Sequence, residues 1–144
     1  MRSKLFVPAS RPELFLKALA GEADAISFDL EDAVEESRKP AARIELEKFL
    51  RSVEGAAPTK LLLVRVNAAT TPHFDADLAA VVWPALAVLN LPMVESPDEV
   101  RAAASLLNQL EEQRGIKTPI RILANIESPR GLRLAAEIAA SDKY

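Results

Sequence analysis

Polar side chains follow three apolar stretches of this sequence, at the points where the stretches end. These residues form the pairs Asp29 and Glu31, Arg65 and Asn67, and Asn125 and Glu127. Side chains alternate between the two faces of a strand, so the two members of a pair are expected to point the same way. A buried charge without a partner is costly, so such groups are normally paired or bound to a metal. Carboxylates and an arginine that converge from three strands would form a site for a cation and a carboxylate.

The same residues also allow a purely structural interpretation. Arg65 could form an internal salt bridge with Glu31 or Asp29 that only fixes the register of the strands, and such bridges are weak evidence for function. We favour the functional interpretation because catalytic residues of barrel enzymes lie at the C-terminal ends of the strands.

The elements that must position these residues alternate between strand and helix. Strands are predicted over residues 4–9, 23–30, 60–66, 87–91 and 120–126. A first helix is expected to begin at Pro12, with Ser10 as its N-cap, and to stop at Gly21. Further helices are predicted over residues 34–53, 75–81, 97–114 and 129–140. The apolar side of helix 34–53 is expected to consist of Ile44, Leu46, Phe49 and Leu50.

This alternation predicts parallel βαβ units, which build either an open doubly wound sheet or a barrel. No Gly-x-Gly-x-x-Gly or P-loop motif follows a predicted strand, which disfavours an open nucleotide-binding sheet. We therefore predict an α/β fold, a (β/α)₈ TIM barrel, with residues 1–144 as the N-terminal part of its single domain. Because a barrel needs about 250 residues, the chain would supply strands one to five and their helices. We expect residues 1–144 alone to be inactive.

Composition excludes several classes of protein. The sequence contains no cysteine, which excludes disulfide frameworks, thiol nucleophiles and zinc–thiolate sites. Its net charge of -3 comes from interspersed acidic and basic residues, which argues against nucleic acid as a partner. No apolar run approaches the roughly 20 residues that span a bilayer. We expect a cytoplasmic protein that binds a small molecule.

Four regions of the sequence together carry a resemblance to a known family. They are RSKLFVPASRP at residues 2–12, FDLEDAV at 28–34 with Lys39 and Arg43 downstream, VRVN at 64–67, and LPMVESPDEV at 91–100 followed by IESPRG at 126–131. In this order they resemble the HpcH/HpaI aldolase and citrate lyase β-subunit family, and most closely its citrate-lyase-β-like branch.

The resemblance implies a Mg²⁺-dependent barrel enzyme that makes or breaks a carbon–carbon bond next to an acyl-CoA thioester. Its substrate would be a dicarboxylic acyl-CoA such as citryl-, malyl- or citramalyl-CoA. The resemblance also implies a homo-oligomer, with a trimer suspected. The alternatives are a CoA-independent class II aldolase of 2-oxo acids, a malyl-CoA thioesterase, a malate-synthase-like enzyme, or a non-catalytic barrel subunit.

The same resemblance assigns roles to individual residues. Glu127 corresponds to the metal-ligating glutamate, which also contacts the substrate, and Arg65 to the arginine that holds the substrate's carboxylate. The remaining candidates are Glu31 and Asp32 as the acidic pair beside the metal, Arg11 at the substrate or CoA entrance, and Lys39 and Arg43 at the CoA phosphates.

The sequence departs from the family pattern in two respects. The second metal ligand of the family lies in a Gly-x-x-Asp segment further along the chain, and no residue up to Tyr144 corresponds to it. Met93 stands where the family usually has lysine, so the substrate is in doubt although the metal site is unaffected. His73, the one histidine, is interpreted as a surface residue because no carboxylate partner for it is evident nearby in the sequence.

Overall fold

The computed structural model describes residues 1–53 and 60–141. Within them one sheet contains β1 (Lys4–Pro8), β2 (Ala25–Asp29), β3 (Leu61–Arg65), β4 (Val88–Leu91) and β5 (Arg121–Ala124). Every pair of neighbouring strands is parallel, and the strand order is β1-β2-β3-β4-β5. A doubly wound sheet reverses its strand order at a switch point, whereas this sheet grows in one direction. The arrangement is that of a barrel segment, as predicted.

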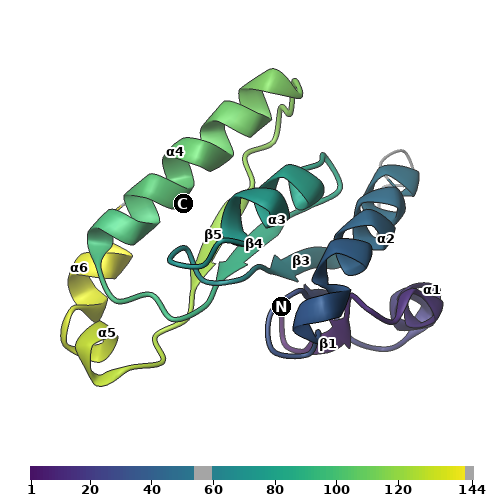
Figure 1. Cartoon of the computed structure of the whole chain (residues 1–144), viewed down its shortest axis with the longest axis horizontal. Coiled ribbons are helices and arrows are strands. Elements are labelled where there is room, and N and C mark those ends of the chain that lie inside the picture. The colour runs from purple at the N-terminus through teal and green to yellow at the C-terminus, as the bar shows by residue number, and fades with distance from the viewer. Residues whose placement is uncertain (54–59, 142–144) are drawn as a thin grey trace.

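Helices connect the successive strands. They are η1 (Pro12–Leu14), α1 (Phe15–Ala20), η2 (Glu36–Arg38), α2 (Lys39–Ser52), α3 (Phe74–Val81), α4 (Pro97–Gln113), α5 (Pro129–Arg133) and α6 (Ala135–Ala139). In Figure 1 the long helices α2 and α4 flank the shorter α3, and α5 and α6 lie near the start of α4. In the described part of the chain, no helix combines the length and apolar character needed to cross a membrane.

One face of the sheet packs against the helices. Alternate strand residues such as Phe28, Val64 and Leu89 are fully buried, and they share one hydrophobic cluster with Leu46 of α2 and Leu107 of α4. The aromatic rings of Phe15, Phe28 and Phe49 meet in this cluster, with centroids 4.8–5.2 Å apart. This burial fixes which strand residues face the helices and, by alternation, which face the opposite side.

The opposite face carries the residues of functional interest, in two rows across the strands. The row nearer the strand ends consists of Pro8, Asp29, Arg65, Asn90 and Leu123. The row below it consists of Phe6, Ser27, Leu63, Val88 and Arg121. In a closed barrel this face lines the interior, and the ends of the strands form the mouth.

Three local predictions are wrong. Ser10 is not an N-cap, because η1 is preceded by Arg11 and has no side-chain cap. Ile44 is exposed, because the buried stripe of α2 passes through Ala42, Leu46 and Leu50 instead. The predicted helix over residues 129–140 is two short helices that meet at Leu134.

Candidate active site

Arg65, the last residue of β3, lies among three carboxylates. Its Nε donates to Asp29 Oδ1 at 2.9 Å, and its Nη2 donates to Asp29 Oδ2 at 2.6 Å. Its Nη1 lies 2.9 Å from Glu31 Oε2 and 3.5 Å from Asp32 Oδ2. Asp29 and Glu31 therefore face the same side, as predicted, and the internal salt bridge that the sequence allowed is present.

Asp29 also fixes the turn that follows β2. Its side chain is almost fully buried, at 2% exposure. Besides the two bonds from Arg65, its carboxylate accepts the backbone N–H of Glu31 at 3.0 Å and that of Ala33 at 3.1 Å. One carboxylate thus positions both the guanidinium and the turn that carries Glu31 and Asp32.

Charge is unevenly balanced in this cluster, where three carboxylates surround one guanidinium. The hydrogen bonds with Asp29 raise the pKa of Arg65, which therefore stays a cation. Burial raises the pKa of Glu31, and repulsion from Asp32 and Asp29 adds to this rise against the opposing attraction of Arg65. The ion-paired Oε2 of Glu31 is buried and lacks a well-directed hydrogen bond. The excess negative charge favours a proton or a metal ion at this place.

Glu127 follows β5 and is held by the neighbouring turn after β4. The backbone N–H of Met93 donates to Glu127 Oε2 at 2.8 Å, and Asn125 Nδ2 lies 3.5 Å from Oε1. Met93 has a φ of 52°, which is uncommon for a residue with a side chain. Gly131 packs so closely on this turn that a Cβ there would lie 2.5 Å from the carbonyl oxygen of Val94. The two turns are therefore locked together around the Glu127 carboxylate.

The carboxylate of Glu127 is suited to serve as one protein ligand of Mg²⁺. Mg²⁺ usually takes one or two carboxylates, with waters and substrate oxygens completing its octahedron. Among the described residues, Glu127 Oε1 has only the long contact with Asn125, so this oxygen is available. Over residues 1–53 and 60–141 no three acidic or histidine side chains form a complete metal site, and no hydrogen bond or ion pair joins Glu127 to Arg65.

Lys39, a candidate for CoA phosphates, has its ammonium group inside the protein. The residue is 7% exposed. Its Nζ donates to the backbone oxygens of Leu30 at 2.9 Å and Glu31 at 3.0 Å, and to Asn67 Oδ1 at 2.7 Å. These bonds use all three N–H groups of the ammonium. Contact with a phosphate stays a prediction, and the geometry gives Lys39 structural partners instead.

Arg43, the second such candidate, also has internal partners. Its Nε donates to Asp77 Oδ1 at 2.6 Å, and its Nη2 lies 2.8 Å from His73 Nδ1. A guanidinium can only donate, so Nδ1 accepts and the proton of a neutral His73 is assigned to Nε2. Nε2 in turn contacts Glu36 Oε1 at 2.5 Å. The interpretation of His73 as a residue without a carboxylate partner is therefore wrong, because Glu36, although distant in the sequence, contacts it in the folded chain.

Asn67 does not point the same way as Arg65, contrary to the prediction. Its Nδ2 donates to Leu30 O at 3.0 Å and to Asp77 Oδ2 at 2.6 Å, and Asp77 belongs to α3. The reason is that β3 ends at Arg65, so strand alternation no longer applies two residues later. Asn67 belongs to the buried network of Lys39 and Asp77.

Arg11, the candidate at the substrate entrance, lies just after β1. Its side chain is about half exposed and forms an ion pair with the equally exposed Glu13. Surface pairs of this kind contribute little to stability. The side chain therefore costs little to redirect, and its contact with a substrate stays a prediction.

Two site residues were not identified from the sequence. Phe6 resembles an ordinary core residue, but it is 46% exposed and its ring lies 5.3 Å from the guanidinium carbon of Arg65. Asn90 lies in the same row as Arg65, inside an apolar run. Strand register supplies the signal for both, because it relates their positions to Arg65.

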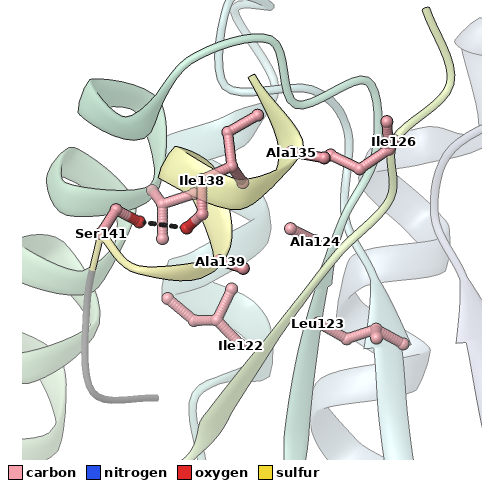
Figure 2. A pocket seen from close by; sticks show the side chains of 9 residues that line it. Ile122, Leu123, Ala124, Ile126, Ala135, Ile138, Ala139 and Ser141 are labelled. Carbon is pink, nitrogen blue, oxygen red and sulfur yellow. Dashed lines mark hydrogen bonds between the residues drawn. The ribbon is translucent and has the colours of Figure 1, made fainter. Parts of the chain in front are cut away.

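Two hollows differ in their capacity for chemistry. An open hollow beside the Arg65 cluster is lined by polar residues that include Glu31, Asp32, Glu36 and His73. Figure 2 shows the other hollow, in which Ile122 and Ala124 of β5 lie opposite Ile138 and Ala139 of α6. The hydroxyl group of Ser141, which lines this hollow, donates to Ile138 O at 2.6 Å. Of the two, the polar hollow is the one lined by ionisable side chains.

Comparison with known proteins identifies the family of the chain. Residues 2–144 match the profile of the HpcH/HpaI aldolase/citrate lyase family. The chain is 36% identical to the citrate lyase subunit beta of Leuconostoc mesenteroides subsp. cremoris, over 99% of this chain and 47% of that protein. It is 33% identical to an L-malyl-CoA/beta-methylmalyl-CoA lyase of Cereibacter sphaeroides, over 97% of this chain and 44% of that protein.

A solved structure shows the same likeness. The citrate lyase beta subunit of M. tuberculosis, complexed with oxaloacetate and magnesium, superimposes with a TM-score of 0.75 at 38% identity. The match covers 96% of this chain and 53% of that structure. The chain thus spans about half the length of the relatives it matches.

The raised pKa of Glu31 predicts a stability change that depends on pH. Folding favours the protonated form of Glu31, so its ionisation destabilises the folded state as pH rises through the raised pKa. Glu31→Gln is therefore expected to raise the melting temperature at pH 8, and the gain should vanish near pH 4, where free glutamate (pKa about 4.3) is also largely protonated. Calorimetry across this pH range measures the effect, and an equal gain at both ends would contradict it.

The bonds of Lys39 predict a structural defect. Lys39→Met keeps the length of the side chain but removes the ammonium donor shared by three oxygens, and it leaves Asn67 Oδ1 without its donor. We expect the free energy of unfolding to fall by about 1.5–3 kcal/mol in urea denaturation. Lys48→Met, at an exposed position of the same helix, is the control and should change it by less than about 0.5 kcal/mol. A phosphate-binding Lys39 would instead leave stability unchanged and weaken CoA binding.

Proposed function

Because the chain belongs to the HpcH/HpaI aldolase/citrate lyase family, we propose that the complete protein is a Mg²⁺-dependent carbon–carbon lyase acting on a dicarboxylic acyl-CoA. The observation that carries the proposal is the Arg65 guanidinium among Asp29, Glu31 and Asp32 at one end of the sheet. The same ends of the strands carry Glu127, held by the Met93 amide.

The proposed reaction cleaves a 3-hydroxyacyl thioester. The hydroxyl loses its proton, the bond between C2 and C3 breaks, and the hydroxyl carbon becomes a carbonyl. The electron pair of the broken bond stays on the thioester fragment as an enolate, which then takes up a proton. Two groups are therefore required: one that receives and returns a proton, and one that stabilises oxygen-centred negative charge.

Arg65 suits the second requirement. Its guanidinium keeps its charge, and it presents a planar set of donors that matches a carboxylate. Pairing with Asp29 holds the guanidinium plane in place before a substrate arrives. Preorganised donors of this kind stabilise charge without reorganisation during the reaction. We assign Arg65 to the substrate's carboxylate and neighbouring oxygen.

Glu31 and Asp32 suit the proton transfer. Burial raises the pKa of Glu31 toward the working range of a general acid or base. Asp32 lies beside it with a side chain that is 77% exposed, which gives the site a route for protons to solvent. We propose that this pair accepts the hydroxyl proton and orders the water near the metal.

Glu127 is the residue that would hold Mg²⁺. When bound, the ion supplies Lewis-acid polarisation of substrate oxygens, worth several kcal/mol of charge stabilisation. The negative charge near Arg65 and the oxygen donors fit this ion. The relative from M. tuberculosis, complexed with oxaloacetate and magnesium, supports this part of the proposal.

The proposal extends to assembly and location. We propose a homo-oligomer, with a trimer as the first candidate because of the family resemblance. A cytoplasmic location fits a sequence without cysteine. Arg11 is the proposed contact at the substrate or CoA entrance, since its side chain is exposed just after β1.

The proposed function is tested by incubating the complete protein with Mg²⁺ and malyl-, citramalyl- or citryl-CoA. We expect acetyl-CoA and a 2-oxo acid to form, and EDTA to stop the reaction. Free CoA without carbon–carbon cleavage would identify a thioesterase. Turnover of oxaloacetate or another 2-oxo acid without CoA would identify a class II aldolase. No turnover of any substrate would indicate a non-catalytic barrel subunit.

Arg65→Lys tests the assigned arginine. Lysine keeps the charge but loses the planar fork, so about 2–4 kcal/mol of transition-state stabilisation should disappear, a loss of 30-fold or more in kcat/KM. Arg51→Lys, at an exposed position of α2, is the matched control and should leave kcat/KM unchanged. Near-normal kcat/KM in Arg65→Lys would refute the role.

A further inference from the structure

Asn90 lies within β4 on the face of the sheet that points away from the helices. Its Cα pairs with that of Arg65 on β3 and that of Leu123 on β5. It therefore lies at the same level as the pair of Arg65 and Asp29, one strand away from the guanidinium. The residue is completely buried, with 0% exposure.

The side chain of Asn90 has no partner for either of its polar atoms. Neither Nδ2 nor Oδ1 forms a hydrogen bond within residues 1–53 and 60–141. More than nine in ten buried polar groups in proteins are paired, because an unpaired one loses its bonds to water. Apart from Arg65, the positions next to it on this face, Leu63, Val88 and Leu123, are apolar. An apolar residue at position 90 would therefore stabilise the fold more than asparagine does.

Asn67 shows what a structural asparagine looks like in this protein. Its Oδ1 accepts from Lys39, and its Nδ2 donates to Leu30 O and to Asp77. Both ends of that amide are used inside the fold. Asn90, within β4, uses neither end. A polar group that is kept at a cost to stability beside a binding site indicates a functional contact.

We propose that the Asn90 carboxamide binds the uncharged hydroxyl group of a hydroxy-acid substrate, beside the carboxylate that Arg65 holds. This inference rests on the proposed function. A carboxamide offers one donor group and one acceptor, both free at this position. In the bound substrate a hydroxyl accepts from Nδ2 and donates to Oδ1, and its hydrogen leaves Oδ1 for the pair of Glu31 and Asp32 only when the carbon–carbon bond is cleaved. A carboxylate or a carbonyl would leave Oδ1 unpaired, and a cation would leave Nδ2 unpaired.

The proposal predicts a specific discrimination between ligands. A site built to bind a hydroxyl disfavours the analogue that lacks it, because the buried partner is left unpaired. Each neutral hydrogen bond of this kind is worth up to about tenfold in affinity. The complete protein with Mg²⁺ should therefore bind L-malate more tightly than succinate, which differs by the hydroxyl alone.

The experiment compares Asn90→Leu with Ser27→Ala in the complete protein. Ser27 is the matched control, because its Oγ is also buried and unpaired but lies in the row below. Melting temperatures are measured by calorimetry, and affinities for L-malate and succinate with Mg²⁺ by titration calorimetry. Asn90→Leu should raise the melting temperature and reduce the preference for malate about tenfold. Ser27→Ala should leave that preference unchanged.

Other results would overturn the proposal. A lower melting temperature for Asn90→Leu, or an equal loss of affinity for both acids, would make Asn90 a structural residue. An unchanged preference for malate would also refute the contact. None of these three results would affect the proposed lyase if acyl-CoA cleavage persists in the parent protein. A parent protein that binds neither acid and cleaves no acyl-CoA would refute the proposed function and this inference together.

Discussion

The carboxylate of Asp29 receives four hydrogen bonds, and the geometry of the mouth depends on them. Two come from the Arg65 guanidinium and two from backbone N–H groups of the turn after β2. A buried carboxylate is tolerable only when it is paired in this way. Loss of Asp29 would free the arginine and the turn at the same time. The pairing of the strands and the geometry of the site therefore depend on the same carboxylate.

The turn that carries Glu31 is held from two sides. Asp29 binds its backbone N–H groups on the inner side of the sheet. Lys39 binds the carbonyl oxygens of Leu30 and Glu31 from the helix side. Behind Lys39, the polar network continues through Asn67 to Asp77 of α3. The acidic residues of the mouth therefore sit on a backbone segment whose donors and acceptors are both fixed by buried charges.

Sequence periodicity was enough to predict the parallel sheet, because the buried strands are continuous apolar runs bounded by polar residues. It also predicted that Asp29 and Glu31 face the same side, and it allowed an ion pair of either carboxylate with Arg65; both ion pairs are present. It failed at Asn67, which lies beyond the end of β3. The partners of His73 could not be predicted either, because Glu36 and Arg43 approach it only once α2 packs on α3. Polar groups at strand ends can be predicted from local sequence patterns, whereas contacts between helices are seen only in the folded chain.

At Met93, whose backbone is left-handed, the main chain and the side chain contribute to the mouth independently. The N–H that orients the Glu127 carboxylate belongs to the main chain, so any residue that tolerates this φ can supply it. The side chain at the same position, 45% exposed, takes no part in that bond. The charge of the side chain at this position can therefore differ while the orientation of the carboxylate is preserved. A different side chain at position 93 could therefore alter which ligands bind at the mouth without moving the Glu127 carboxylate.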